Sequence, residues 1–117
     1  MPKTVLIVDD HAGFRCAARA MLEAEGYEVA GESATGAEAI EAVERLTPDL
    51  VLLDICLPDF DGIEVADRLT TVDRSLHVVL TSSRDACDYQ PQLGRCGARG
   101  FIPKGELTGS AVAALTT

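Results

Sequence analysis

The chain has 117 residues, which is enough for one domain and too few for two well-packed ones. Its 10 Lys and Arg residues against 19 Asp and Glu residues give a net charge of −9, which excludes the clustered cationic surface needed to bind nucleic acid or anionic lipid directly. Apolar residues make up 47% of the sequence, yet no apolar run approaches the roughly 20 residues that span a bilayer, so one domain with one hydrophobic core is predicted.

Strand-like and helix-like apolar patterns alternate along the chain. Continuous apolar runs, typical of strands buried on both faces of a parallel sheet, lie at 5–8, 50–53 and 78–80, and weaker strand patterns lie at 27–32 and 100–103. Because parallel strands are joined by right-handed helical crossovers, this alternation predicts an α/β fold: a doubly wound, five-stranded parallel sheet with helices on both faces.

Helices are predicted between and after these strands by apolar residues at helical spacing and by signals at their ends. The first runs from Phe14 to Leu22 and stops before Gly26. The other four are expected after a capping box at Thr35 and Glu38, after Asp61, across 88–96, and from about 108 to the end of the chain.

Polar residues follow four of the predicted strands. The first strand ends in Asp9 and Asp10, the third in Asp54 and the fourth in Thr81 and Ser82, and Lys104 comes shortly after the fifth. In a doubly wound sheet, ligands bind beyond the carboxyl ends of the strands. We therefore expect three carboxylates, hydroxyl groups and an ammonium group to share one pocket at this edge.

The chemistry of such a pocket favours phosphoryl transfer. Three close carboxylates repel one another, so they either take up a proton or recruit a cation, and oxygen ligands suit a hard ion such as Mg²⁺. A carboxylate beside Mg²⁺ and a lysine is well placed to attack phosphorus and form an acyl phosphate. Taken singly, each residue has a plainer explanation: a helix cap for Asp9, Asp10 or Thr81, a turn residue for Asp54, and a solvated side chain for Lys104.

One segment carries a family resemblance: Asp54-Ile55-Cys56-Leu57-Pro58-Asp59-Phe60-Asp61-Gly62 matches the pattern D-x-x-[LM]-P-x-x-D-G. Together with Val8-Asp9-Asp10, Thr81-Ser82 and Phe101-Ile102-Pro103-Lys104, it resembles the CheY-like response-regulator receiver domains of two-component signalling. The resemblance covers essentially the whole chain. It implies a flavodoxin-like sheet with strand order 2-1-3-4-5 and a single receiver domain over residues 1–117, and it leaves open an output domain beyond residue 117.

The resemblance also implies a phosphorylation site and a metal site. Asp54 is the expected phosphoacceptor, and Mg²⁺ is the expected cofactor. Asp10 and Asp54 are expected to hold the ion directly, and Asp9 through water or as a close neighbour. The backbone carbonyl of Cys56 completes the expected protein ligands, so the cysteine side chain at this position does not impair the metal site.

Further residues are implied to respond to phosphorylation. Thr81, Ser82 and Lys104 are expected around the phosphoryl group, and Phe101 matches the aromatic residue that turns inward as Thr81 moves. This movement would couple the site to the face formed by the fourth helix, fifth strand and fifth helix. That face is the expected contact for a downstream effector or a fused output domain, and a candidate homodimer interface.

By this resemblance the chain receives its phosphoryl group from a sensor histidine kinase or a phosphotransfer protein. It is then no enzyme toward external substrates, since it catalyses only its own phosphorylation and dephosphorylation. Two alternatives stay open: a phosphorylation-independent interaction module on the same fold, and a Mg²⁺-dependent aspartyl-phosphate phosphotransferase or phosphatase. Haloacid-dehalogenase-type enzymes place a second Asp two residues after the nucleophile, whereas Cys56 stands two residues after Asp54.

The other motifs predict no second site. The segment 31–36 has the glycine spacing of a P-loop, but Ala37 stands where the lysine is needed. His11 is expected as an exposed residue of the first helical turn rather than a ligand. A signal peptide is not indicated at the N-terminus, so a cytoplasmic location is expected. The cysteines include no C-x-x-C pair, so we expect reduced, buried thiols rather than a zinc site; they are Cys16, Cys56, Cys87 and Cys96.

Overall fold

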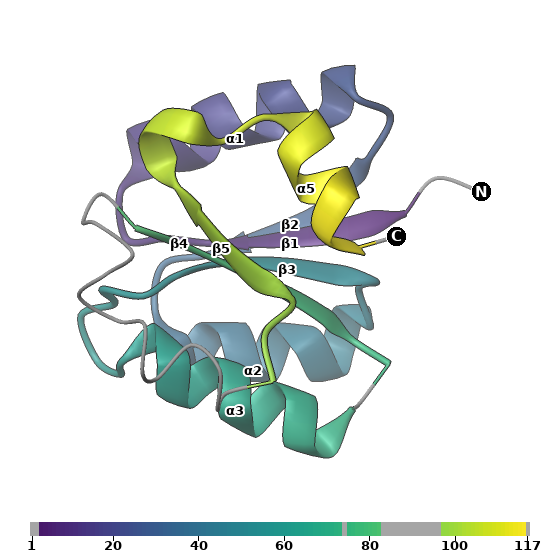
Figure 1. The fold of residues 1–117 in the computed structure, drawn as a ribbon. Helices are drawn as coiled ribbons and strands as arrows, with labels where there is room; N and C mark the ends of the chain where they lie inside the picture. The colour runs from purple at the N-terminus through teal and green to yellow at the C-terminus, as the bar shows by residue number, and fades with distance from the viewer. Residues whose placement is uncertain (1–2, 74, 83–96, 117) are drawn as a thin grey trace.

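The computed structural model describes residues 3–73, 75–82 and 97–116. Strands and helices alternate through these residues (Figure 1). In chain order the elements are β1 (Thr4–Val8), α1 (Ala12–Ala24), β2 (Glu28–Ser33), α2 (Gly36–Leu46), β3 (Leu50–Asp54), α3 (Gly62–Val72), β4 (His77–Ser82), β5 (Gly100–Pro103), the 3₁₀ turn η2 (Lys104–Glu106) and α5 (Gly109–Thr116).

The strands form one parallel sheet in the order β2-β1-β3-β4-β5. Figure 1 shows α1 and α5 covering one face of this sheet and α2 and α3 covering the other. The strand order and the two helical layers confirm the predicted doubly wound α/β fold. Because β1 and β3 are neighbours, with Val8 opposite Leu53, the residues that follow these two strands meet at the same edge.

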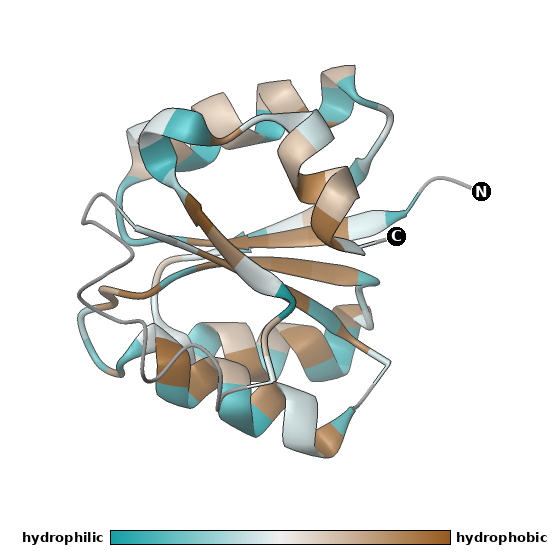
Figure 2. Ribbon diagram, in the orientation of Figure 1, coloured by the Kyte–Doolittle hydropathy of each residue, from teal (hydrophilic) through white to brown (hydrophobic). Residues whose placement is uncertain are grey.

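Each face of the sheet packs on its own hydrophobic cluster. Along β1, Leu6 and Val8 belong to the cluster under α2 and α3, whereas Val5 and Ile7 belong to the cluster under α1 and α5. All four side chains are fully buried. Both faces of the strand are apolar because both are covered, which explains the continuous apolar run in the sequence. Figure 2 shows the hydrophobic strands enclosed between the two layers of helices.

Side chains cap the start of α2 and of α3 as predicted. Thr35 Oγ1 accepts the backbone N–H of Glu38 at 3.1 Å. The Glu38 carboxylate accepts the N–H of Ala34 at 3.1 Å, one residue earlier than in the usual capping box. Asp61 Oδ1 accepts the N–H of Ile63 at 2.8 Å. These bonds satisfy N–H groups that have no partner within the helix.

Some sequence-based predictions are corrected by the structure. The second strand is shifted by one residue, to 28–33. Cys16 and Cys56 are exposed, so the expectation that they are buried is wrong for both.

The predicted fourth helix, 88–96, lies outside the described residues, as do Cys87 and Cys96. The homodimer face that includes this helix therefore stays a prediction. Within 3–73, 75–82 and 97–116, the helices lack the combined length and hydropathy that crossing a bilayer requires.

Gly62, the first residue of α3, touches the end of β3. A Cβ at this position would overlap the backbone carbonyl of Asp54 and lie 2.6 Å from the Cα of Ile55. We expect Gly62→Ala to lower the free energy of unfolding by about 2–3 kcal/mol, because backbone rather than a flexible side chain must move. Urea denaturation measures the change. Gly105→Ala is the matched control: a Cβ there meets nothing within 4 Å, and an equal loss in both variants would contradict the steric explanation.

Candidate functional site

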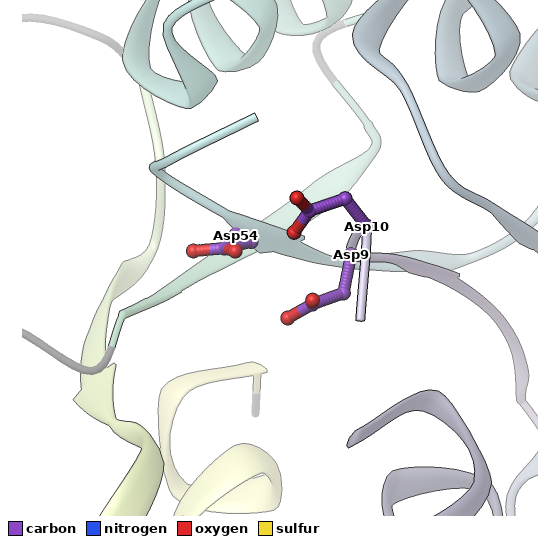
Figure 3. Close-up of side chains that lie close together, drawn as sticks. All are labelled: Asp9, Asp10 and Asp54. Atoms are coloured by element: carbon purple, nitrogen blue, oxygen red, sulfur yellow. The ribbon is translucent and has the colours of Figure 1, made fainter. Parts of the chain in front are cut away.

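Three carboxylates from two neighbouring strands meet at the carboxyl edge of the sheet (Figure 3). Asp54 is the last residue of β3, and Asp9 and Asp10 directly follow β1. One oxygen from each carboxylate lies within 4.8 Å of the others. Asp9 is fully buried and Asp54 is 4% exposed, whereas Asp10 is exposed. The predicted convergence of the three acids is thus present in the structure, while their roles stay predictions.

Lys104 lies among these acids, at the start of η2. Its Nζ is 2.7 Å from Asp9 Oδ2 and 3.5 Å from Asp54 Oδ2. The same nitrogen lies 4.3 Å from the centre of the Phe14 ring, which is a cation–π contact. Burial lowers the pKa of Lys104, but the two carboxylates outweigh this effect and raise the pKa above its usual value. Lys104 therefore stays an ammonium ion and neutralises part of the acidic cluster.

The environment of Asp54 disfavours its charged form. The pKa of Asp54 is raised overall, and burial is the largest cause. The Asp9 charge also raises the pKa, whereas the Cys56 N–H and Lys104 lower it. The Cys56 N–H donates to Asp54 Oδ1 at 3.2 Å and so orients the carboxylate. A cation bound beside Asp54 would favour the ionised form that a nucleophile requires.

The turn between β1 and α1 holds Asp9 in place. Asp9 Oδ1 accepts the N–H of His11 at 2.8 Å, and the Arg15 guanidinium donates to the Asp9 carbonyl oxygen. Arg15 also pairs with Glu32 of β2 at 3.1 Å. His11 itself caps α1, since its Nδ1 accepts the N–H of Phe14 at 3.3 Å. The helix-cap explanation for the acids after β1 therefore does not hold, and His11 is exposed as predicted.

An open pocket of about 510 Å³ gives solvent access to the acids. It brings acidic, cationic and aromatic groups together at one end of the sheet. Its lining residues are Asp10, His11, Phe14, Asp54, Cys56 and Lys104. The pocket therefore contains a candidate nucleophile, candidate metal ligands and a cation within reach of one another.

The other predicted residues lie on β4 and β5. Thr81 stands opposite Asp54 in the sheet register, and its Oγ1 is buried without a hydrogen-bond partner among the described residues. Ser82 is buried at the end of β4. Phe101 of β5 is half-buried against the cluster under α2 and α3 and does not line the pocket. Because a buried hydroxyl without a partner is rare, Thr81 is suited to bond a group that enters from the pocket.

Two residues of α1 were missed by the sequence analysis. Phe14 packs against the core cluster as its place in the apolar stripe predicts, but its contact with Lys104 is not predicted. Arg15 links Asp9 to Glu32, a residue 17 positions away. The pairing of β1 with β2 could have indicated the contact between Arg15 and Glu32, because it brings the end of β2 close to the first turn of α1.

Asp59 connects the loop after Asp54 to the start of α2. Its carboxylate accepts the N–H of Gly36 at 2.8 Å and the N–H of Ala37 at 3.0 Å. Partial desolvation raises the pKa of Asp59, but these donors and the Phe60 N–H outweigh it, so the pKa is lowered overall. The negative charge also suits the positive end of the helix dipole. The loop that follows Asp54 is thereby tied to the α2 layer.

We expect Asp59→Asn to lower the urea midpoint at neutral pH, because an amide cannot accept both N–H groups as a carboxylate does. The pKa of Asp59 is lower in the folded than in the unfolded chain. Its contribution to stability is therefore present above the usual Asp pKa of about 3.9 and is lost as the pH falls through the folded value. Asp67→Asn, at an exposed position on α3, is the control. If the urea midpoints of Asp59→Asn and the unsubstituted chain differed as much at acid pH as at neutral pH, the role given to the Asp59 charge would be contradicted.

Residues 5–115 match the response regulator receiver domain family. The chemotaxis protein CheY of Thermotoga maritima is 36% identical over 104 residues, which are 89% of this chain and 87% of that protein. The transcriptional regulatory protein PdtaR of Mycobacterium tuberculosis is 42% identical over 96 residues, which are 80% of this chain and 47% of that protein.

A similar fold is found in the crystal structure of the CheX–CheY–BeF3–Mg²⁺ complex from Borrelia burgdorferi. The TM-score is 0.85 at 28% identity, covering 98% of this chain and 87% of the matched chain. The fold and the pocket define a doubly wound α/β domain with an acidic site at its carboxyl edge. The chain belongs to the response regulator receiver domain family of two-component systems. It spans about half the length of the transcriptional regulators that it matches.

Proposed function

We propose that this domain accepts a phosphoryl group on Asp54 from a sensor histidine kinase or phosphotransfer protein, in a Mg²⁺-dependent reaction. The observation that carries the proposal is the convergence of Asp9, Asp10 and Asp54 within 4.8 Å of one another, beside the Lys104 ammonium group. The site is open to solvent through the pocket. Reversible phosphorylation, rather than turnover of an external substrate, is the activity that follows.

The phosphoryl transfer is a single displacement at phosphorus, in which one bond forms and one bond breaks. An oxygen of the Asp54 carboxylate attacks the phosphorus atom and forms an O–P bond, while the N–P bond of phosphohistidine breaks and its electron pair returns to the imidazole nitrogen. The Lys104 ammonium pairs with the phosphoryl oxygens, and the Thr81 hydroxyl is free to donate to one of them. The Cys56 N–H keeps the attacking carboxylate oriented.

The donor set fits Mg²⁺. Three carboxylates, two of them buried, place more negative charge at this edge than the single Lys104 ammonium neutralises. Asp10, Asp54 and the backbone carbonyl of Cys56 would hold the ion, with Asp9 beside it, since hard oxygen ligands suit Mg²⁺. When bound, the ion would neutralise charge that develops on the phosphoryl oxygens. The related CheY in the Borrelia burgdorferi complex was crystallised with BeF3 and Mg²⁺, which supports this assignment.

Phosphorylation is proposed to shift the domain between two conformations. Thr81 and Phe101 lie on the adjacent strands β4 and β5, so a movement of the hydroxyl toward the phosphoryl group can be passed to the half-buried ring. The output would go to a downstream effector or a fused output domain, as the relatives named as transcriptional regulators suggest. The domain is proposed to act in the cytoplasm.

Intact-mass spectrometry after incubation with Mg²⁺ and a small acyl phosphate tests the proposal. The unsubstituted chain is expected to gain one phosphoryl group. Asp54→Ala is expected to gain none, because it lacks the attacking oxygen. Removing Mg²⁺ with a chelator is expected to stop the reaction in the unsubstituted chain.

Asp67→Ala, which removes an exposed carboxylate on α3, is the matched control and should be phosphorylated normally. A folded domain that gains no phosphoryl group under any donor would favour the interaction-module alternative. Sustained hydrolysis of a phosphate ester would instead favour a phosphatase. Phosphorylation that persists in Asp54→Ala would contradict the assignment of the acceptor.

A further inference from the structure

A hydrophobic groove lies between α2 and α3, the pair of helices on the opposite side of the sheet from α1 and α5 (Figure 1). Its volume is about 460 Å³, and its apolar lining comes from Ile40 and Val43 of α2 and from Leu69 and Val72 of α3. Ile40 and Val43 are half-buried against the core beneath the groove. Val72 is 84% exposed, and it is the one large hydrophobic side chain so exposed among the described residues. The groove thus offers apolar surface that the core does not use.

The rim of this groove is acidic. Glu44 of α2 and Asp67 of α3 line it, with Asp73 at the end of α3. Neither Glu44 nor Asp67 forms an ion pair with another residue in the described part of the chain. Arg68 also lines the groove, but its guanidinium group already forms an ion pair, with Nη2 3.1 Å from Glu64 Oε1. The charge that the groove presents to solvent is therefore negative.

Negative charge extends across this whole part of the chain. Residues 36–73 hold ten of the 19 acidic residues and two of the 10 basic residues, a net charge of −8 out of −9 for the whole chain; of the ten, Asp54 is buried at the carboxyl edge of the sheet and does not face the groove. A second copy of the chain would meet this surface with like charge, as would a nucleic acid or an anionic membrane. A cationic partner meets it with opposite charge.

We propose that the groove between α2 and α3 docks a cationic amphipathic helix of a partner protein. An apolar side chain of that helix fills the groove and covers Val72, and its Lys and Arg residues face Glu44 and Asp67. A groove between two helices is a common binding site for a third, amphipathic helix. The apolar centre supplies most of the affinity, while the charged rim selects the partner and accelerates the encounter.

The test uses the full chain labelled with ¹⁵N and a synthetic peptide of leucine and lysine whose leucines repeat at helical spacing. The amide signals of Ile40, Val43 and Val72 are expected to shift on titration. Val72→Glu is expected to weaken binding about tenfold, even though it adds a negative charge that attracts the peptide. Because Val72 is 84% exposed, this substitution leaves the core intact.

Ala20→Glu is the matched control, since it adds the same charge at an exposed position of α1 in the opposite layer. It is expected to leave binding unchanged or slightly tighter. If Val72→Glu also binds as tightly as the unsubstituted chain, charge alone explains the attraction and the proposal is overturned. Equal binding of a peptide with the same composition but scrambled leucines also overturns it. Signals that shift with concentration in the chain alone, at these same amides, would assign the groove to a second copy instead.

Discussion

Replacing Lys104 with methionine is expected to slow phosphorylation of Asp54 about 100-fold or more, the typical cost of removing one group that stabilises charge in a transition state. Methionine keeps an aliphatic side chain over the Phe14 ring and removes the ammonium group. That group lies 2.7 Å from Asp9 Oδ2 and 3.5 Å from Asp54 Oδ2, so it is the protein cation nearest to the proposed acceptor among the described residues. Intact-mass time courses with Mg²⁺ and an acyl phosphate measure the rate.

The same substitution is expected to destabilise the metal-free protein by on the order of 3 kcal/mol, because it leaves the fully buried Asp9 carboxylate without its cation. Mg²⁺ is expected to recover part of this lost stability. It is also expected to bind Lys104→Met more tightly than the unsubstituted chain, because the ammonium group no longer competes for Asp9 Oδ2. Urea denaturation with and without Mg²⁺ measures both effects. Lys3→Met, at an exposed lysine far from the site, is the control. An unchanged phosphorylation rate in Lys104→Met would contradict the role given to Lys104.

The fold was predictable because its strongest signals are local. The runs at 5–8 and 50–53 are typical of strands covered on both faces, and the caps at Thr35 and Asp61 marked where helices begin. The convergence of Asp9 and Asp54 followed from topology alone, since both come at the carboxyl ends of strands that are neighbours. The strands and caps are thus marked by short stretches of sequence, and the convergence of the acids needs only the strand order in addition.

Contacts between distant segments could not be predicted in this way. Asp59 reads as an ordinary polar residue of a loop, yet it caps a helix that begins 23 residues earlier. Phe14 packs against the core as the apolar stripe of α1 indicates, but the stripe does not indicate that Lys104 lies over its ring. Periodicity reports which face of a helix is apolar, but it does not report which side chain from another element arrives there. The details that tune the site therefore came from the structure.

Mg²⁺ is expected to raise the thermal midpoint of this domain, because the proposed site brings together three carboxylates that repel one another in the folded chain and are far apart in the unfolded chain, and a bound ion would relieve that repulsion. At a concentration 100 times the dissociation constant, the gain is about 2.7 kcal/mol, or roughly 10 °C. Differential scanning calorimetry over a series of Mg²⁺ concentrations measures it. Asp10→Ala is expected to lose most of this gain with little change in the metal-free midpoint, since Asp10 is exposed.

Asp54→Asn is expected to behave differently from Asp10→Ala, because Asp54 is buried and its pKa is raised in the folded chain. A carboxyl group with a raised folded pKa opposes folding above its unfolded pKa of about 3.9 and has no effect well below it. Asp54→Asn should therefore stabilise the metal-free domain at neutral pH, by an amount that vanishes as the pH falls below that value, and should reduce the gain from Mg²⁺. If Asp54→Asn destabilised the metal-free domain at neutral pH, Lys104 would have to compensate the buried acids fully. No unbalanced negative charge would then remain at this edge to attract a divalent ion.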